Sequence, residues 1–301
     1  MPLGTLGVRF PGLKPLSDIR IVTLAVNVPG PAAAARLSEL GAAVTKVEPP
    51  AGDPLAHINP CWYEALCKGL EVVRLDLKGG RDREAFERLL EKSDLLLTSQ
   101  RPAALARLSL GWDKLHVRLP QLIQVAIVGY PEPNQHLPGH DLTYVAKRGL
   151  LTPPHLPRTL IADLGGAERA VTAAVALLLA RERGHDNGYA EVALSEAGDF
   201  FAMPLRYGIS APGAPLGGGL PYYNLYRALE GWIALGALEP RFREKLQEEL
   251  GLRELTREAL EQVFLLRTAP EWEEWGVHRD LPVAAVEEPH KAAEASDAVP
   301  Q

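Results

Sequence analysis

Three ionisable side chains stand where they could act as acids or bases. His140 and Asp141 follow a glycine in the stretch LPGHDLTYVAKRGLL (137–151), and Asp163 separates an apolar run from the pair Gly165–Gly166. An imidazole exchanges protons near neutral pH, and a carboxylate can serve as its partner in a partly dry site. Taken alone, His140 also fits a structural histidine in a loop. Asp163 also fits the N-cap of the helix that follows it, where it would bond to unpaired backbone N–H groups.

Four further charged residues could take part in a site. Lys78, Arg101 and Arg107 lie at or just beyond the ends of expected strands, and Glu239 lies at the end of the apolar run WIALGALEP (232–240). Because ligands of open α/β sheets bind outside the carboxyl ends of the strands, cations there would suit a polyphosphate or a CoA tail. On chemistry alone, the three cations also fit solvated surface charges, and the glutamate also fits a surface turn.

The turn NVPGPAAAARL offers a possible phosphate site, because Gly30 lies between two prolines where a strand passes into a helix. The first turn of a helix leaves N–H groups unpaired, and these could bind an anion. The simpler interpretation is a proline at the first helical position. The turn is not the G-x-G-x-x-G fingerprint of dinucleotide binding, which disfavours a nicotinamide-dependent dehydrogenase.

Composition excludes several classes of function. The chain has 301 residues, 47% hydrophobic and 23% charged, as is ordinary for a globular protein. Its formal net charge of −6 provides no basic field for nucleic acid. No apolar run approaches the ~20 residues of a membrane-spanning helix, and the N-terminus lacks a secretion signal, so we expect a cytoplasmic protein. The spacing of Cys61 and Cys67 fits neither a metal site nor a redox pair, so we expect free thiols and no metal.

Strands and helices alternate over the first half of the chain. Apolar runs predict strands over residues 19–26, 43–48, 71–77, 94–99 and 122–130, and helical spacing predicts helices over 31–42 and 81–93. We expect a functional proline-rich loop over 49–62, and a long helix that follows Asp163 and ends at Gly184. This alternation predicts an α/β fold with a Rossmann-like, doubly wound parallel sheet.

The pattern changes in the last third of the chain. A short strand runs into a helix over 189–208, and a Gly- and Pro-rich hinge or flap follows over 210–223. A strand over 232–240 then precedes two surface helices. We therefore predict a large domain over 1–203, a second, smaller α+β domain over 204–285, and a short tail over 286–301 that returns to the large domain or is frayed.

Seven segments, taken in order, resemble the class III CoA-transferase superfamily, which includes carnitine CoA-transferases, formyl-CoA transferases and α-methylacyl-CoA racemases. They cover most of residues 15–285 and read LSDIRIVTLA, PGPAAAARLSELGAAVTKVEPP, RLDLKGG, SDLLLTSQRPAALARLSLGW, LPGHDLTYVAKRGLL, IADLGGA and YYNLYRALEGWIALGALEP. Transferases of this group typically read GFD where the racemases read GHD, and His140 matches the racemases. Asp163 matches the family's second catalytic acid, and Glu239 matches the glutamate of the racemase motif GAIEP.

The resemblance implies an acyl-CoA racemase or epimerase that interconverts the stereoisomers of 2-methylacyl-CoA, or of a similar 2-substituted acyl-CoA, and needs no cofactor besides this CoA thioester substrate. His140 and Asp163 would exchange protons with opposite faces of the α-carbon, and Glu239 would orient and charge-balance the imidazole. The residues expected to bind CoA are Lys78, Arg101, Arg107, Gly139, Tyr144 and Asp141, the last also being a structural neighbour of the histidine. The resemblance also implies a homodimer of interlocked chains.

The chain departs from the family pattern in four places, one of which is an NxGKR-like segment that here reads ALCKGLE and keeps only Lys68. Pro49 stands where an arginine meets the CoA phosphates, Thr159 stands where the racemases have an asparagine, and the C-terminal stretch is short. Two alternatives therefore stay open. In a CoA-transferase, Asp163 would attack a thioester and carry the acyl group as a mixed anhydride. In a non-catalytic homologue, the chain would bind CoA or a partner without converting a thioester.

Overall fold

The computed structural model describes residues 11–186 and 188–288, so most of the expected tail, over 289–301, lies outside the described residues. The chain divides into two compact units between Ala202 and Met203. No helix among the described residues has the length and apolar character needed to cross a membrane.

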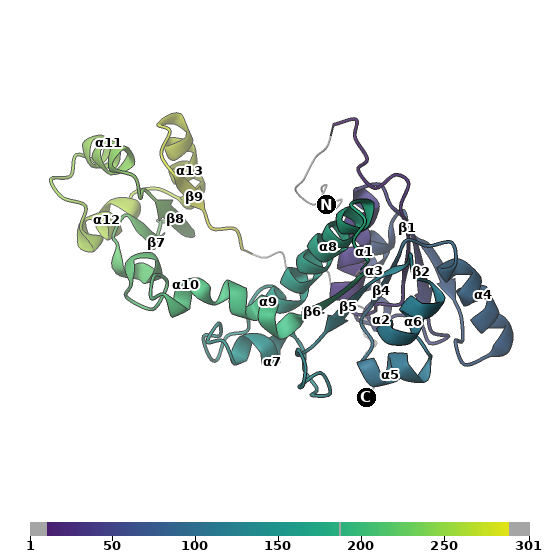
Figure 1. Ribbon diagram of the computed structural model, residues 1–301. Helices are drawn as coiled ribbons and strands as arrows, with labels where there is room; N and C mark the ends of the chain where they lie inside the picture. The colour runs from purple at the N-terminus through teal and green to yellow at the C-terminus, as the bar shows by residue number, and fades with distance from the viewer. Residues whose placement is uncertain (1–10, 187, 289–301) are drawn as a thin grey trace. The chain divides into compact units, whose positions relative to one another are not determined.

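The first unit is built on a parallel sheet of six strands (Figure 1). These are β1 (Arg20–Thr23), β2 (Ala43–Glu48), β3 (Glu71–Arg74), β4 (Leu95–Thr98), β5 (Ile123–Val128) and β6 (Tyr189–Ala193). Their order is β3-β2-β1-β4-β5-β6, and every neighbouring pair is parallel. The order reverses between β1 and β4, as in a doubly wound fold. The predicted Rossmann-like sheet is therefore confirmed.

Helices cover both faces of this sheet, which explains why its central strands are apolar runs and not alternating patterns. One face packs against α1 (Pro29–Glu39), α3 (Pro60–Cys67), α7 (Asp141–Ala146) and α8 (Ile161–Glu182). The other face packs against α4 (Gly80–Leu90), α5 (Pro102–Arg107) and α6 (Trp112–Arg118). Successive leucines of β4 point to opposite faces, so that Leu95 and Leu97 join the first core and Leu96 joins the second.

The segment over 49–62 differs from its prediction as a loop, because it holds α2 (Pro54–Ile58) and the first turn of α3. Each of these short helices has a polar N-cap followed by a proline. The Asp53 side chain accepts a hydrogen bond from the backbone N–H of Leu55, and the Asn59 side chain accepts one from Trp62. The Asp-Pro and Asn-Pro pairs are therefore helix starts, since proline at the first helical position sacrifices no internal bond.

The second unit is smaller and mixes helices with an antiparallel sheet, as predicted for an α+β domain. Its sheet has the order β7-β8-β9, formed by β7 (Tyr223–Arg227), β8 (Trp232–Gly236) and β9 (Val283–Ala285). Its helices are α10 (Met203–Arg206), α11 (Pro240–Leu250), α12 (Arg257–Phe264) and α13 (Ala269–His278). The helix before them, α9 (Leu194–Phe201), is the last helix of the first unit. One side of the sheet packs on an aromatic core that contains Tyr226, Phe264 and Trp272.

The stretch predicted as a hinge or flap, over 210–223, contains the irregular turn η1 (Pro215–Gly219). The carbonyl oxygen of Gly218 accepts hydrogen bonds from the side chains of Asn224, at 3.0 Å, and Arg257, at 2.6 Å. These bonds tie the turn to β7 and to α12.

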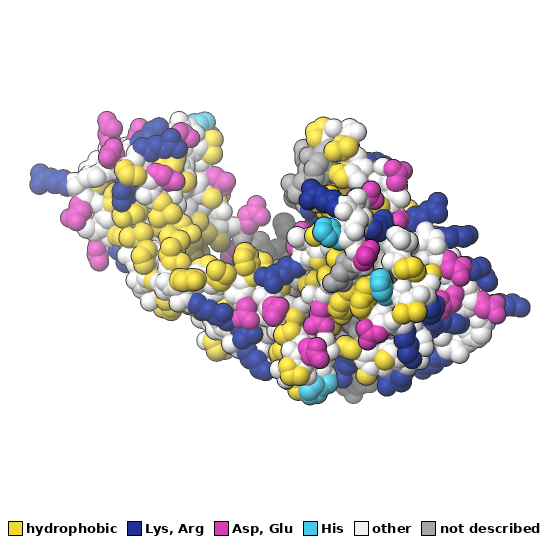
Figure 2. Space-filling view, viewed as in Figure 1, with side chains coloured by type: hydrophobic (Ala, Val, Ile, Leu, Met, Phe, Trp, Pro, Cys, Tyr) yellow, Lys and Arg dark blue, Asp and Glu magenta, His cyan; other side chains and the backbone are white. Residues whose placement is uncertain are grey.

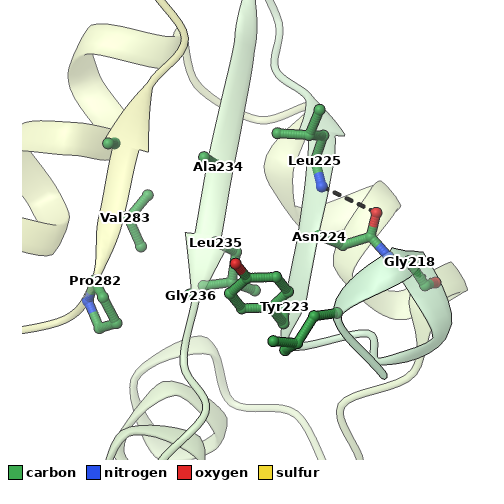
Figure 3. A pocket seen from close by; sticks show the side chains of 11 residues that line it. Gly218, Tyr223, Asn224, Leu225, Ala234, Leu235, Gly236, Pro282 and Val283 are labelled. Carbon is green, nitrogen blue, oxygen red and sulfur yellow. Dashed lines mark hydrogen bonds between the residues drawn. The ribbon is translucent and has the colours of Figure 1, made fainter. Parts of the chain in front are cut away.

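The other side of the small sheet is open and apolar. A cavity of about 640 Å³ lies on it, between the β7 residues Tyr223, Asn224 and Leu225, the β8 residues Ala234 and Gly236, and Pro282 beside β9 (Figure 3). Leu225 is 56% exposed and Trp232 is 47% exposed. Figure 2 shows many apolar side chains gathered on the surface of this unit. A sheet face of this kind resembles the part of a core that another layer normally covers.

The start of α1 depends on close packing of a glycine. The first helical residue is Pro29, in agreement with the simpler interpretation of the turn. A Cβ atom on Gly30 would lie 2.7 Å from the backbone carbonyl carbon of Ala25. Gly30 therefore lets α1 approach the end of β1.

We predict that Gly30→Ala destabilises the fold by about 1–3 kcal/mol, because the added methyl group overpacks the contact with Ala25. Helix propensity alone predicts the opposite sign, a gain of up to about 1 kcal/mol. The matched control is Gly80→Ala at the first residue of α4, where an added Cβ meets nothing within 4 Å. Chemical denaturation of both variants measures the difference, and equal stabilities would contradict the packing argument.

Candidate active site

A cavity of about 280 Å³ opens at the carboxyl ends of β1, β4 and β5. Its wall is formed by Val26, Asn27, Pro29, Ser99, Arg101, Ile127, Val128, Gly129, Gln135, Leu137, Pro138, Gly139, His140, Tyr144, Asp163 and Leu194. This is the edge at which ligands of open α/β sheets bind. The cavity brings together His140 and Asp163, which are 23 residues apart in the chain.

Asp141 has a structural role that also connects the two candidate bases. Its side chain is only 3% exposed, and its Oδ1 accepts hydrogen bonds from the backbone N–H groups of Ala162, at 2.7 Å, and Asp163, at 3.0 Å. These N–H groups belong to the first turn of α8, which has no partner for them within the helix. Asp141, the first residue of α7, therefore caps α8 from another helix, and it does not line the cavity.

The prediction that Asp163 caps the long helix is wrong. The helix begins at Ile161, its N-cap position is Leu160, and Asp163 is the third helical residue. Because Asp141 already satisfies the N–H groups of this turn, the side chain of Asp163 is available to the cavity.

Burial raises the pKa of Asp163 from an ordinary 3.8 to about 7, and the nearby charge of Asp141 adds to the rise. Removing a carboxylate from water disfavours its ionised form, and a second carboxylate nearby disfavours it further. A carboxyl group with such a pKa is present in both protonation states near neutral pH, so it can either give or take a proton.

His140 lies at the N-cap position of α7 with an extended backbone, φ −138° and ψ 167°. The hydroxyl of Thr143 accepts a hydrogen bond from the backbone N–H of His140, at 3.0 Å, and donates one to its carbonyl oxygen, at 2.8 Å. These bonds hold the backbone while the side chain remains exposed at the cavity wall.

The wall includes residues that the sequence analysis did not single out. Asn27 has a left-handed backbone, φ 65°, and its N–H donates to Oδ1 of Asp53 at 3.0 Å. Asp53 is fully buried, and its Oδ2 accepts a hydrogen bond from Nζ of the buried Lys46 at 2.7 Å. Ser99 accepts the N–H of Val26. Two features of the sequence could have pointed to these residues. Asn27 is a residue type that tolerates a left-handed backbone, and Lys46 and Asp53 are opposite charges close together in the sequence, beside and within the proline-rich segment.

The predicted CoA-binding residues are distributed over several places. Arg101, Gly139 and Tyr144 line the cavity of His140. Lys78 lines a neighbouring apolar cavity of about 250 Å³, which also includes Pro49 and shares the residue Val26 with the first. Arg107 is exposed at the end of α5 and lines neither cavity.

Glu239 and the two cysteines lie outside this cavity. Glu239 is exposed at the N-cap position of α11, in the second unit. Cys61 is exposed and Cys67 is half-buried, and both are free thiols. Among residues 11–186 and 188–288, no group of three or more His, Cys, Asp or Glu side chains could hold a metal ion.

We predict that Asp141→Ala costs about 1–3 kcal/mol of stability, because it leaves two N–H groups of α8, one buried and one partly buried, without a partner. Asp141→Asn keeps an acceptor oxygen and should cost less. Urea denaturation of the two variants measures this order. A neutral Asp141→Ala variant would contradict the role of Asp141 as a cap.

A second prediction concerns the pH dependence of stability. Between the ordinary pKa of 3.8 and the raised value of about 7, the folded state holds a proton on Asp163 that the unfolded state has lost. Stability therefore falls as pH rises through this range. The variant Asp163→Asn has no group that titrates at this position. The free energy of unfolding of the variant, minus that of the unchanged protein, should therefore be larger at about pH 8 than at about pH 5. Thermal melts at both pH values test this, and a pH-independent difference would contradict the raised pKa.

Comparison with known proteins shows the family to which the chain belongs. The model of the family described as CoA-transferase family III matches residues 16–300. Human alpha-methylacyl-CoA racemase is 30% identical over 256 residues, covering 79% of this chain and 65% of the racemase. The chain thus spans about two thirds of the length of that relative. A probable fatty acyl-CoA transferase of Mycobacterium tuberculosis is 28% identical, covering 86% of this chain and 79% of that protein.

Solved structures agree with this assignment. A crystal structure of a hypothetical protein from M. tuberculosis has a TM-score of 0.76 and 26% identity, covering 91% of this chain and 85% of that one. A CAIB/BAIF family protein from Brucella suis has a TM-score of 0.74, which shows the shared fold. The relatives include both racemases and CoA-transferases, so the reaction is not decided by similarity. Because the family model covers nearly the whole chain, the protein belongs to CoA-transferase family III.

Proposed function

We propose that the protein is an acyl-CoA racemase or epimerase that interconverts 2-methylacyl-CoA stereoisomers, or those of a similar 2-substituted acyl-CoA, by proton transfer. The observation that carries this proposal is that His140 and Asp163 line one cavity while the pKa of Asp163 is raised to about 7. The racemase sequence GHD, at Gly139 to Asp141, and the similarity to human alpha-methylacyl-CoA racemase support it.

The reaction requires two bases, because the proton leaves one face of the α-carbon and returns to the other. In one direction His140 takes the α-proton, the C–H electron pair moves toward the thioester carbonyl, and an enolate forms. Protonated Asp163 then delivers a proton to the opposite face. In the other direction Asp163 takes the proton and the imidazolium returns one. Each turnover moves the single shared proton between the two residues, and no cofactor takes part.

The two neighbouring cavities offer an arrangement for the CoA thioester. The reacting end would occupy the cavity of His140 and Asp163, and the rest of the molecule would extend past Val26 toward the apolar cavity of Lys78. Arg101 and Lys78 would meet phosphate oxygens along this path. Arg107 lines neither cavity, but the next residue, Leu108, lines the apolar one. Pro49 lines the apolar cavity and would offer the ligand apolar contact there in place of a charge.

The open apolar face of the second unit supports a further part of the proposal, which is that the protein is a homodimer. Leu225 and Trp232 lie on this face with about half of their surface exposed, although large apolar side chains are normally buried. A second copy of the chain would cover them. Glu239 keeps its predicted role of orienting and charge-balancing His140, as part of this proposal.

We predict that the two bases can be separated by isotope exchange. Each enantiomer of 2-methylacyl-CoA is deuterated at C2, incubated in light water and followed by mass spectrometry. The unchanged protein should lose the label from both enantiomers. His140→Ala should abolish the loss from one enantiomer and Asp163→Asn from the other, because each variant lacks the base for one face.

The same experiment distinguishes the alternative reactions. No exchange with any branched acyl-CoA would contradict the racemase proposal. A CoA-transferase would instead form an acyl-aspartate at Asp163, which hydroxylamine traps and peptide mass spectrometry detects. CoA binding by calorimetry, with neither exchange nor trapping, would indicate a non-catalytic homologue.

A further inference from the structure

Tyr144 is held rigidly in the wall of the cavity, one helical turn after His140 in α7. The residue is only 3% exposed, and its ring packs edge-on against the ring of Tyr130, with centroids 5.2 Å apart and planes at 80°. Such aromatic pairs restrict the orientation of both rings. The position of the Tyr144 hydroxyl is therefore fixed by packing.

Two glycines from different segments make room for this hydroxyl. A Cβ atom on Gly129, which follows β5, would lie 2.5 Å from the Tyr144 hydroxyl oxygen. A Cβ atom on Gly139, which precedes His140, would lie 2.8 Å from the same oxygen. Both glycines line the cavity. The hydroxyl thus lies between two backbone segments at the cavity wall, and both segments have a glycine, without a side chain, at this point.

The Tyr144 hydroxyl has no hydrogen-bond partner within the part of the chain that the structure describes, although it shares the cavity with Arg101 and Asp163. Burial raises the pKa of Tyr144 to about 12, with a smaller contribution from the charge of Asp163. The phenol is therefore neutral at physiological pH and can donate its hydrogen. A donor at a cavity wall that has no protein partner is free to bond to a ligand or to water.

We propose that the Tyr144 hydroxyl donates a hydrogen bond to the thioester oxygen of the bound acyl-CoA and stabilises the enolate. This inference rests on the proposed function and deepens it. When the α-C–H bond breaks, the electron pair moves into the carbonyl and negative charge develops on the oxygen. The hydroxyl keeps its own proton throughout, and its hydrogen bond shortens as that charge grows. Fixed donors aimed at developing charge usually make the largest contribution to catalysis.

This role is more specific than the CoA contact that the sequence predicts for Tyr144. The hydroxyl lies in the cavity that also holds the two candidate bases, and Lys78 lies in the neighbouring one. In the substrate, the thioester oxygen is bonded to the carbon next to the α-carbon, so it lies close to the carbon that loses its proton. A donor in this cavity is therefore suited to the thioester oxygen, while the cations suit the phosphates.

The test is Tyr144→Phe, which keeps the buried ring and removes only the hydroxyl. Loss of one such donor typically lowers kcat by about 10²–10³, so the variant should show this loss in C2 deuterium exchange with both enantiomers. KM should rise far less than kcat falls, because the hydrogen bond to the neutral thioester oxygen is weaker than the bond to the enolate oxygen. The thermal midpoint should stay close to that of the unchanged protein. The matched control is Tyr130→Phe, which removes the neighbouring phenol oxygen outside the cavity and should retain activity. A Tyr144→Phe variant as active as the unchanged protein would overturn the proposal.

A binding experiment separates this inference from the proposed function. Propionyl-CoA and its thioether analogue propyl-CoA, which lacks the carbonyl oxygen, are titrated by calorimetry. The unchanged protein should prefer the thioester, and Tyr144→Phe should lose that preference while binding the thioether equally well. If the unchanged protein catalyses no exchange, the racemase proposal fails, and this measurement still decides the role of Tyr144. An undiminished preference in Tyr144→Phe overturns it.

Discussion

The candidate site depends on the hydrogen bonds that Asp141 makes to the first turn of α8. They join two segments that are more than twenty residues apart, one carrying His140 and the other carrying Asp163. They satisfy backbone N–H groups that would otherwise be unpaired, and they fix the two segments against each other. The same buried carboxylate helps to raise the pKa of Asp163. One side chain therefore contributes to both the geometry and the proton affinity of the site.

The sheet provides the second constraint. The cavity lies where β1, β4 and β5 end, and the strand order reverses between β1 and β4. At such a point the connections leave to opposite faces and open a crevice. Gly129 and Gly139 then set how closely the backbone approaches Tyr144. Backbone geometry places the functional groups, and the apolar strands behind them keep this frame in place.

Much of the fold could be predicted from the sequence, since buried parallel strands are apolar runs and the long helices have a clear period. The short helix of His140 could not, because six residues carry too little periodicity. The role of Asp163 was partly mistaken, since the cap of its helix comes from Asp141, a contact that no local pattern reveals. The close approach of Gly129 and Gly139 to Tyr144 was also hidden. Gly129 was expected at the end of a strand and Gly139 as a CoA contact, and no local pattern shows that both make room for the same hydroxyl.

The cap on α8 also affects which molecules the cavity can accept. The amino end of a 22-residue helix carries a partial positive charge, and Asp141 occupies its second and third N–H groups from inside the protein. Little of that electropositive end is left to attract an anion from solution. Under the proposed function, a free carboxylate beside Asp163 would lie near the negative charge of Asp141, whereas a thioester is uncharged at the equivalent atoms. The helix cap therefore favours an uncharged group over an anion in this part of the cavity.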